Sequence, residues 1–120
     1  MSQLAAEQIV LCKRGTPPLA GVELAALLSA VPQWRVTQDQ EIPQLQRTFV
    51  FKNFVEALRF TNVIGDLAEQ ANHHPALLLE WGIVKVSWWT HTIKGLHRND
   101  FILAARCDAA YSPADAPTTS

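Results

Sequence analysis

The sequence contains few of the features that mark membrane, secreted or zinc-binding proteins. None of its apolar runs approaches the roughly 20 residues that are needed to span a bilayer. Its two cysteines, Cys12 and Cys107, are far apart and form neither a paired-cysteine zinc motif nor a disulfide framework. No basic segment precedes the first apolar residues, so we expect no signal peptide. We therefore predict a cytoplasmic protein with reduced thiols and no membrane partner.

An excess of charge of either sign is also missing. Ten Lys and Arg residues face eleven Asp and Glu residues, which gives a net charge of -1. Nucleic-acid binding depends largely on a concentrated positive charge. The basic residues of this chain are scattered, as on an ordinary solvated surface. We therefore expect no direct nucleic-acid partner.

The two ends of the chain lack a periodic apolar pattern, whereas the middle has one. Residues 1–21 include Gly15, Pro17 and Pro18, which favour an extended lead-in. Residues 109–120 are mainly Ala, Pro, Ser and Thr, a composition that predicts a disordered tail. One domain over residues 22–108 is expected between them.

Apolar spacing within this domain alternates between helical and strand-like. Helices are predicted at residues 22–31 and 53–72, with a third helix capped by Asn99. Strands are predicted at residues 34–37, 45–51, 77–80 and 83–91. Hairpins that alternate with helices favour an α+β fold, with one antiparallel sheet and the helices packed on one of its faces. The helix at residues 53–72 has two apolar faces, so we expect it to be central or covered by another subunit.

The histidines His73, His74 and His91, and also the fourth, His97, lie between the carboxylates Glu69 and Asp100. Histidine titrates near neutral pH and can both donate and accept a proton. Strand alternation places His91 at the end of its strand, and a turn at Gly82 would bring that end back beside the histidine pair. The segment therefore predicts a pocket with several acid–base groups.

The same histidines and acids are also compatible with a metal site or with purely structural roles. Three histidines and an acid could bind zinc, but their spacing matches no helical H-E-x-x-H motif, so we expect no metal. The vicinal pair His73 and His74 could simply end a helix before Pro75. Glu69 could hold a histidine tautomer, accept a substrate N–H or be an ordinary exposed acid. The helix dipole alone would favour Asp100 near a helix start.

The four tryptophans also allow two interpretations. They could stack on a flat heterocycle, but tryptophan in short strands more often belongs to a core or an interface. We expect a core role for each of them: Trp34, Trp81, Trp88 and Trp89.

The spacing of this region resembles a known signature. Glu69-x-x-x-His73-His74-Pro75 is followed by Trp81, His91 and Asp100 at intervals of five, nine and eight residues. This pattern is similar to that of the pterin-4a-carbinolamine dehydratases, and the resemblance covers roughly residues 22–108. Trp81 stands where that family usually has an aromatic residue, often tyrosine.

The resemblance implies a four-stranded antiparallel sheet with three helices on one face, assembled as dimers or tetramers. It also implies dehydration of 4a-hydroxytetrahydrobiopterin, the product of aromatic amino-acid hydroxylases, to the quinonoid dihydropterin. Neither a metal nor an organic cofactor is expected. The similarity to bacterial members encoded beside phenylalanine hydroxylase suggests a functional link with that enzyme. The alternative is a non-enzymatic coactivator or assembly factor of the same fold, but the presence of all three histidines favours an enzyme.

The resemblance also assigns roles to individual residues. His73 and His91 would be the acid–base pair, His74 would hold and polarise the substrate, and Asp100 would orient a histidine. The remaining predicted substrate-binding residues are Glu69, Asn72, Pro75, Trp89, Thr90 and Thr92.

Overall fold

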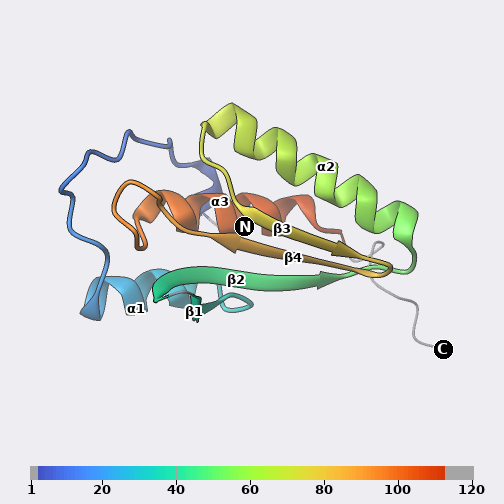
Figure 1. The fold of residues 1–120 in the computed structure, drawn as a ribbon, viewed down its shortest axis with the longest axis horizontal. Helices are drawn as coiled ribbons and strands as arrows, with labels where there is room; N and C mark the ends of the chain where they lie inside the picture. Colours follow the sequence, from blue (N-terminus) through green and yellow to red (C-terminus); the bar gives the residue numbers. More distant parts are fainter. Residues whose placement is uncertain (1–2, 40, 113–120) are drawn as a thin grey trace.

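The computed structural model describes residues 3–39 and 41–112, which form an α+β fold (Figure 1). A short 3-10 helix, η1, opens the described chain. The elements in chain order are η1 (Gln3–Ala6), α1 (Gly21–Ala30), β1 (Arg35–Asp39), β2 (Ile42–Val50), α2 (Phe54–Ala71), β3 (Ala76–Glu80), β4 (Ile83–Trp88) and α3 (Arg98–Ala110).

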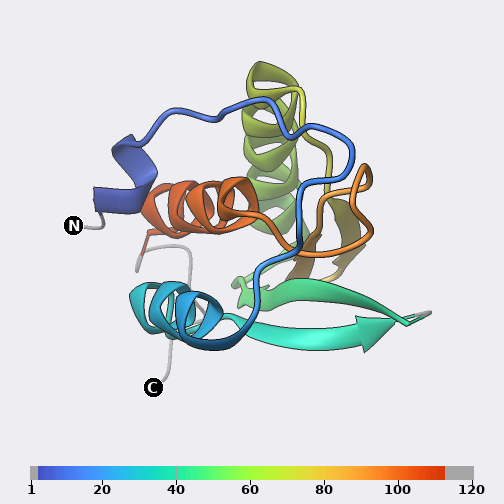
Figure 2. The ribbon, with the colours of Figure 1, turned by 90° about the vertical axis from the view of Figure 1, so that its left-hand side faces the viewer.

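The four strands form one antiparallel sheet in the order β1-β2-β4-β3. In the hairpin of β3 and β4, Ala76 pairs with Ser87 and Glu80 pairs with Ile83. This register brings the end of β4 back to the start of β3, as the turn at Gly82 predicted. Figure 2 shows the helices on one side of the sheet. The predicted α+β class and element order are therefore confirmed.

The core between sheet and helices is centred on Phe49 of β2, which is fully buried. Its ring lies 4.7 Å from the ring of Phe60 in α2 and 5.0 Å from that of Tyr111, just after α3. Trp34 also contacts Phe49 edge-on at 5.8 Å. Such edge-on and tilted aromatic contacts fix geometry as well as bury apolar area. They hold α2 and α3 in a defined position over the sheet.

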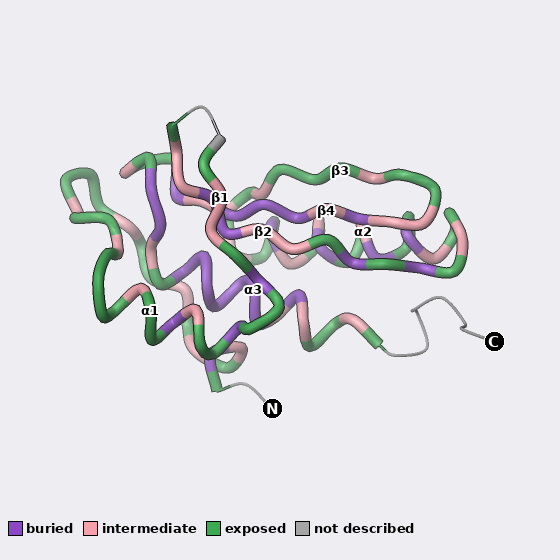
Figure 3. The backbone as a smooth tube through the Cα atoms, turned by 90° about the horizontal axis from the view of Figure 1, so that it is seen from below, coloured by how far each residue is buried: buried purple, intermediate pink, exposed green. Residues whose placement is uncertain are grey.

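Helix α2 buries apolar residues from both of its predicted faces and leaves other apolar residues of both faces exposed. Asn53 caps it by accepting a hydrogen bond from the backbone N–H of Glu56 at 2.9 Å, as predicted. The buried residues are Ala57, Phe60, Ile64 and Ala68. The exposed apolar residues are Phe54, Val55, Leu58 and Val63. The neighbouring strand β3 is also exposed over most of its length (Figure 3).

Several predicted details are wrong at the element ends. The N-cap of α3 is His97, not Asn99, because the imidazole of His97 accepts from the backbone N–H of residue 99 at 3.0 Å. Helix α3 continues through residues 109 and 110, the first two of the predicted tail, and residues 113–120 of that tail lie outside the described chain. Trp81 is 69% exposed at the hairpin tip, contrary to the predicted core role. Trp34 and Trp88 are buried, as predicted.

The N-terminal lead-in is attached to the domain along α3. Arg106 donates hydrogen bonds to the backbone carbonyls of Ala5 at 3.1 Å and Glu7 at 2.7 Å. The carboxylate of Glu7 in turn receives two hydrogen bonds from Arg98, both at 2.7 Å. The lead-in is therefore fixed to the helix that carries Asp100. Among the described residues, no helix has the length and apolar character needed to cross a membrane.

Candidate active site

The end of α2 determines where the histidine pair lies. Asn72 adopts left-handed backbone geometry, with φ of 51° and ψ of 44°, and ends the helix. Asparagine tolerates this geometry better than most residues. The backbone N–H of His73 still bonds to the carbonyl of Ala68, at 3.1 Å. Pro75 prevents a further helical turn and the chain then extends into β3. The two histidines therefore lie in the turn between helix and sheet.

His73 is paired with a carboxylate that has no exposure to solvent. Its Nε2 lies 2.6 Å from Oδ1 of Asp100, which is 0% exposed. The other carboxylate oxygen accepts hydrogen bonds from the hydroxyl of Thr90 at 2.8 Å and from the backbone N–H of His97 at 2.9 Å. A carboxylate can only accept, so Nε2 of His73 carries the proton and Nδ1 is left as the basic nitrogen.

The ring of His73 is also held by packing. It stacks on the indole of the buried Trp88, with centroids 5.9 Å apart and planes 19° apart. Trp88 is the last residue of β4, opposite the start of β3. The hydrogen bond to Asp100 and the stacking contact together fix the orientation of the imidazole. A preset orientation is what an acid–base group requires.

Glu69 is paired with His74. Its carboxylate lies 2.5 Å from Nε2 of His74, and both side chains are largely exposed. On an uninterrupted helix, a spacing of four residues would place Glu69 on the same face as His73. The helix ends at Ala71, however, so the four-residue spacing no longer applies beyond that point.

His91 lies beyond the end of β4 rather than within it. The strand ends at Trp88, and Thr90 then pairs with Gly95 around a tight turn. The exposed ring of His91 lies 4.6 Å from the ring of Trp89. The turn leaves this histidine exposed, among the residues that line a cavity.

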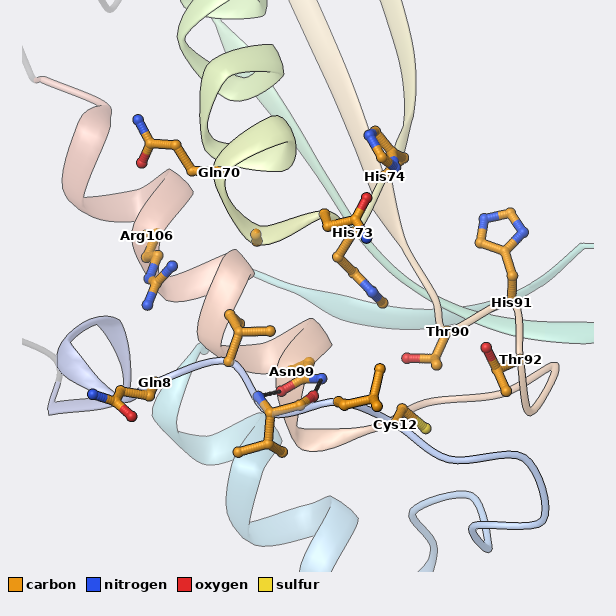
Figure 4. A pocket seen from close by; sticks show the side chains of 15 residues that line it. Gln8, Cys12, Gln70, His73, His74, Thr90, His91, Thr92, Asn99 and Arg106 are labelled. Carbon is orange, nitrogen blue, oxygen red and sulfur yellow. Dashed lines mark hydrogen bonds between the residues drawn. The ribbon is translucent and has the colours of Figure 1, made fainter.

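A cavity of about 920 Å³ connects these residues (Figure 4). Six of the predicted site residues line it: Asn72, His73, His74, Thr90, His91 and Thr92. Asp100 is behind this wall and reaches the cavity through His73. Glu69, Pro75 and Trp89 are not part of the lining, although Glu69 and Trp89 contact histidines that are. The roles assigned to these residues stay predictions.

Other lining residues were not predicted from the sequence. They are Gln8 to Cys12 of the lead-in, Gln70 and Ala71 of α2, and Asn99 and Arg106 of α3. The lead-in has no periodic pattern, so nothing in its sequence indicated contact with the site. Asn99 was recognised only as a helix-capping residue. Its position directly before Asp100 was the one available signal.

The remaining reactive side chains offer no metal site. Within the described part of the chain, no group of three or more His, Cys, Asp or Glu residues is arranged to hold a metal ion. Cys107 is fully buried in the core, and burial raises the pKa of its thiol well above the usual range. A thiol that resists deprotonation is a poor nucleophile, so Cys107 is a core residue.

His97 predicts a pH dependence of stability. Partial burial, followed by the nearby His73, lowers its pKa below the ordinary 6.5, while Asp100 opposes the shift. The unfolded chain therefore binds the proton more readily than the folded chain does. The contribution of neutral His97 to the free energy of unfolding is present above pH 6.5 and is lost as the pH falls through the pKa of His97 in the folded state. Protonation also removes the Nδ1 acceptor that caps α3.

We expect the free energy of unfolding of the wild-type protein to fall as the pH is lowered from about 8 to about 5. His97→Asn should reduce this fall, because asparagine caps a helix without titrating in this range. Urea denaturation of both proteins across this range measures the difference. An identical pH dependence in the two proteins would assign the effect to another group.

Comparison with known proteins identifies the family. Residues 17–110 match the sequence model of the family described as pterin 4 alpha carbinolamine dehydratase. The chain belongs to this family, as the histidine signature predicted.

Relatives and solved structures agree with this assignment. A protein of Marinobacter nauticus, provisionally named a pterin-4-alpha-carbinolamine dehydratase, is 53% identical over 92% of this chain and 100% of its own length. One from Saccharophagus degradans with the same provisional name is 48% identical over 92% of this chain and 98% of its own length.

Two solved structures share the fold. The crystal structure of a transcriptional coactivator/pterin dehydratase from Brucella melitensis has a TM-score of 0.70 at 27% identity, over 78% of this chain and 97% of its own. A pterin dehydratase-like protein identified as a RuBisCO assembly factor in the alpha-carboxysome has a TM-score of 0.55 at 24% identity. It covers 64% of this chain and 87% of its own, and it supports the fold alone.

Proposed function

We propose that this protein dehydrates 4a-hydroxytetrahydrobiopterin to the quinonoid dihydropterin and so recycles the cofactor of aromatic amino-acid hydroxylases. The observation that carries the proposal is the buried His73–Asp100 pair, at 2.6 Å, in the wall of a cavity that His91 also lines. A cavity of this size exceeds what a two-ring heterocycle with a short side chain needs.

The reaction needs one acid and one base. The substrate carries a hydroxyl on C4a beside the N–H of N5. Protonation of the hydroxyl lets the C4a–O bond break as the N5 lone pair forms a C=N bond. Water leaves, and loss of the N5 proton gives the neutral quinonoid product. The reaction involves no net oxidation or reduction, so the protein needs to supply only the two proton transfers.

The residues of the cavity can supply both groups. With Nε2 bound to Asp100, Nδ1 of His73 is available to accept a proton. His91 also lines the cavity and is exposed, so it can exchange protons with solvent as well as with a bound molecule. His73 and His91 would form the acid–base pair. His74 would polarise the substrate while its ring is held by Glu69.

The test is a direct assay of the purified protein. The 4a-carbinolamine is generated with phenylalanine hydroxylase, and its decay is followed with and without this chain. We expect the added protein to accelerate the decay. No acceleration at any pH between about 6 and about 9 would overturn the proposal, because histidine acid–base chemistry operates in this range.

A second candidate function is that of a binding protein. The exposed apolar residues on α2 favour it, because an unpartnered apolar helix face usually marks an interaction surface.

We expect the wild-type protein to have the native mass of a dimer or tetramer. Leu58→Glu should shift this mass toward that of the monomer, because assembly would bury the new charge. A Glu56→Gln control on the same helix should keep the assembled mass, and a monomeric wild-type protein would contradict this expectation. The link to phenylalanine hydroxylase and the cytoplasmic location remain predictions.

A further inference from the structure

One wall of the cavity comes from the N-terminal strap, which we define as residues 7–12. Residues 8–12 of the strap line the cavity together with the histidines. The strap precedes the region that matches the family model, which begins at residue 17. This part of the wall therefore lies outside the segment that carries the histidine signature.

The strap is held by a buried side chain of α3. The amide of Asn99, which is 2% exposed, accepts a hydrogen bond from the N–H of Val10 at 3.1 Å and donates one to its carbonyl at 2.6 Å. Figure 4 shows both bonds, with the strap passing below His73. One side chain thus satisfies both backbone groups of Val10, as a neighbouring strand would. The bond of Glu7 with Arg98 is a second attachment.

The strap presents uncovered apolar side chains to the cavity. Val10 is 57% exposed and Leu11 is 85% exposed, yet both are among the residues that line it. The same cavity is also lined by polar groups that include Thr90, Thr92 and the histidines. An apolar wall with a few convergent polar groups suits a flat heterocycle with polar edges. A bound ring would cover the strap side chains and leave its edges to the polar wall.

We propose that the N-terminal strap is a substrate-binding wall for the pterin ring and that Asn99 is the positioning residue that holds it in place. The inference rests on the proposed dehydratase function. Asn99 would act without touching the reacting atoms, because its amide is occupied by Val10. A detached strap would have to be ordered when substrate binds, and that ordering would weaken the affinity.

Binding is tested with two variants that detach the strap from different sides. Val10→Pro removes the backbone N–H that donates a hydrogen bond to Asn99. Asn99→Ala removes both hydrogen bonds between Asn99 and Val10. We expect each to weaken the Kd for the unreactive analogue 7,8-dihydrobiopterin by about tenfold, as expected for the loss of one or two hydrogen bonds. Arg59→Ala is the control, because it breaks only an exposed ion pair with Glu56 on α2. Circular dichroism confirms that each variant is folded.

Limited trypsin digestion provides a readout that needs no enzymatic activity. Lys13 and Arg14 are exposed cleavage sites directly after the strap. We expect 7,8-dihydrobiopterin to slow cleavage there in the wild-type protein, and both strap variants to be cleaved faster than the wild type. Unchanged cleavage and Kd in folded variants would overturn the inference, as would a wild-type protein that does not bind the analogue.

Kinetics separate this inference from the proposed function. If the protein is a dehydratase, Val10→Pro should raise KM for 4a-hydroxytetrahydrobiopterin more than it lowers kcat, because the His73–Asp100 pair is untouched. A loss confined to kcat would overturn the role of the strap and leave the dehydratase function standing. If the analogue binds and protects the strap but no dehydration occurs, the role of the strap stands and the dehydratase function is overturned.

Discussion

His73→Ala should lower kcat/KM for dehydration of 4a-hydroxytetrahydrobiopterin by about 10²–10⁴-fold, the contribution of one positioned acid–base group. The orientation of this imidazole is fixed by two contacts. It is bonded to a buried carboxylate at 2.6 Å and stacked on Trp88. Its removal leaves Asp100 with no partner on Oδ1, so we also expect some loss of stability. Initial rates and thermal unfolding of the same preparations measure both effects.

A matched histidine control is available. His97→Asn replaces an imidazole whose side chain caps α3 and does not line the cavity. Its kcat/KM at pH 8 should stay near that of the wild type. If His73→Ala retains full activity, His73 is not one of the acid–base groups. If both variants lose activity equally, the loss reflects stability and not catalysis.

Asp100→Asn should lower kcat/KM by about 10²-fold, because it changes the tautomer of His73. The equivalent change in a protease triad costs about 10⁴-fold. We expect a smaller loss here because the second acid–base group, His91, is unchanged. The amide oxygen can still accept from Thr90 and the backbone N–H of His97, so the cap of α3 is retained. The amide NH₂ then faces Nε2 of His73. Nε2 must become an acceptor, and the proton moves to Nδ1, where the base is needed.

A double-mutant cycle isolates this mechanism from a general loss of structure. Asp100→Asn should cost little further activity in a His73→Ala background, because its effect acts through the missing imidazole. Equal losses in both backgrounds would show that Asp100 acts independently of His73. Asp100→Ala is expected to be less stable than Asp100→Asn, because it leaves the Thr90 hydroxyl and the His97 N–H without their acceptor.

The fold was largely predictable because local patterns and tertiary packing agree. The alternation of β4 and the turn at Gly82 correctly predicted the hairpin that brings the end of β4 beside the start of β3. The exposure of Trp81 could not be predicted in this way. Its residue type favours burial, but its place at the hairpin tip leaves nothing to pack against.

The candidate site was predictable in its residues but less so in its contacts. The resemblance implied that Asp100 orients a histidine without naming which one, and in the structure Asp100 is hydrogen-bonded to His73. The pairing of Glu69 with His74 depends on the left-handed geometry of Asn72, which changes the direction of the chain after the helix. Helical spacing cannot describe residues beyond such a turn. The contribution of the strap was not predictable, because it depends on tertiary contacts alone.

The bond between Val10 and Asn99 has a consequence for biosynthesis. These residues are 89 positions apart, so the strap leaves the ribosome well before its anchor does. The strap cannot dock until α3 has been translated, although the sheet can pair earlier. A nascent chain can therefore present its histidine turn while one wall of the cavity is still missing. The ability to hold a ligand would then appear only after α3 has been translated.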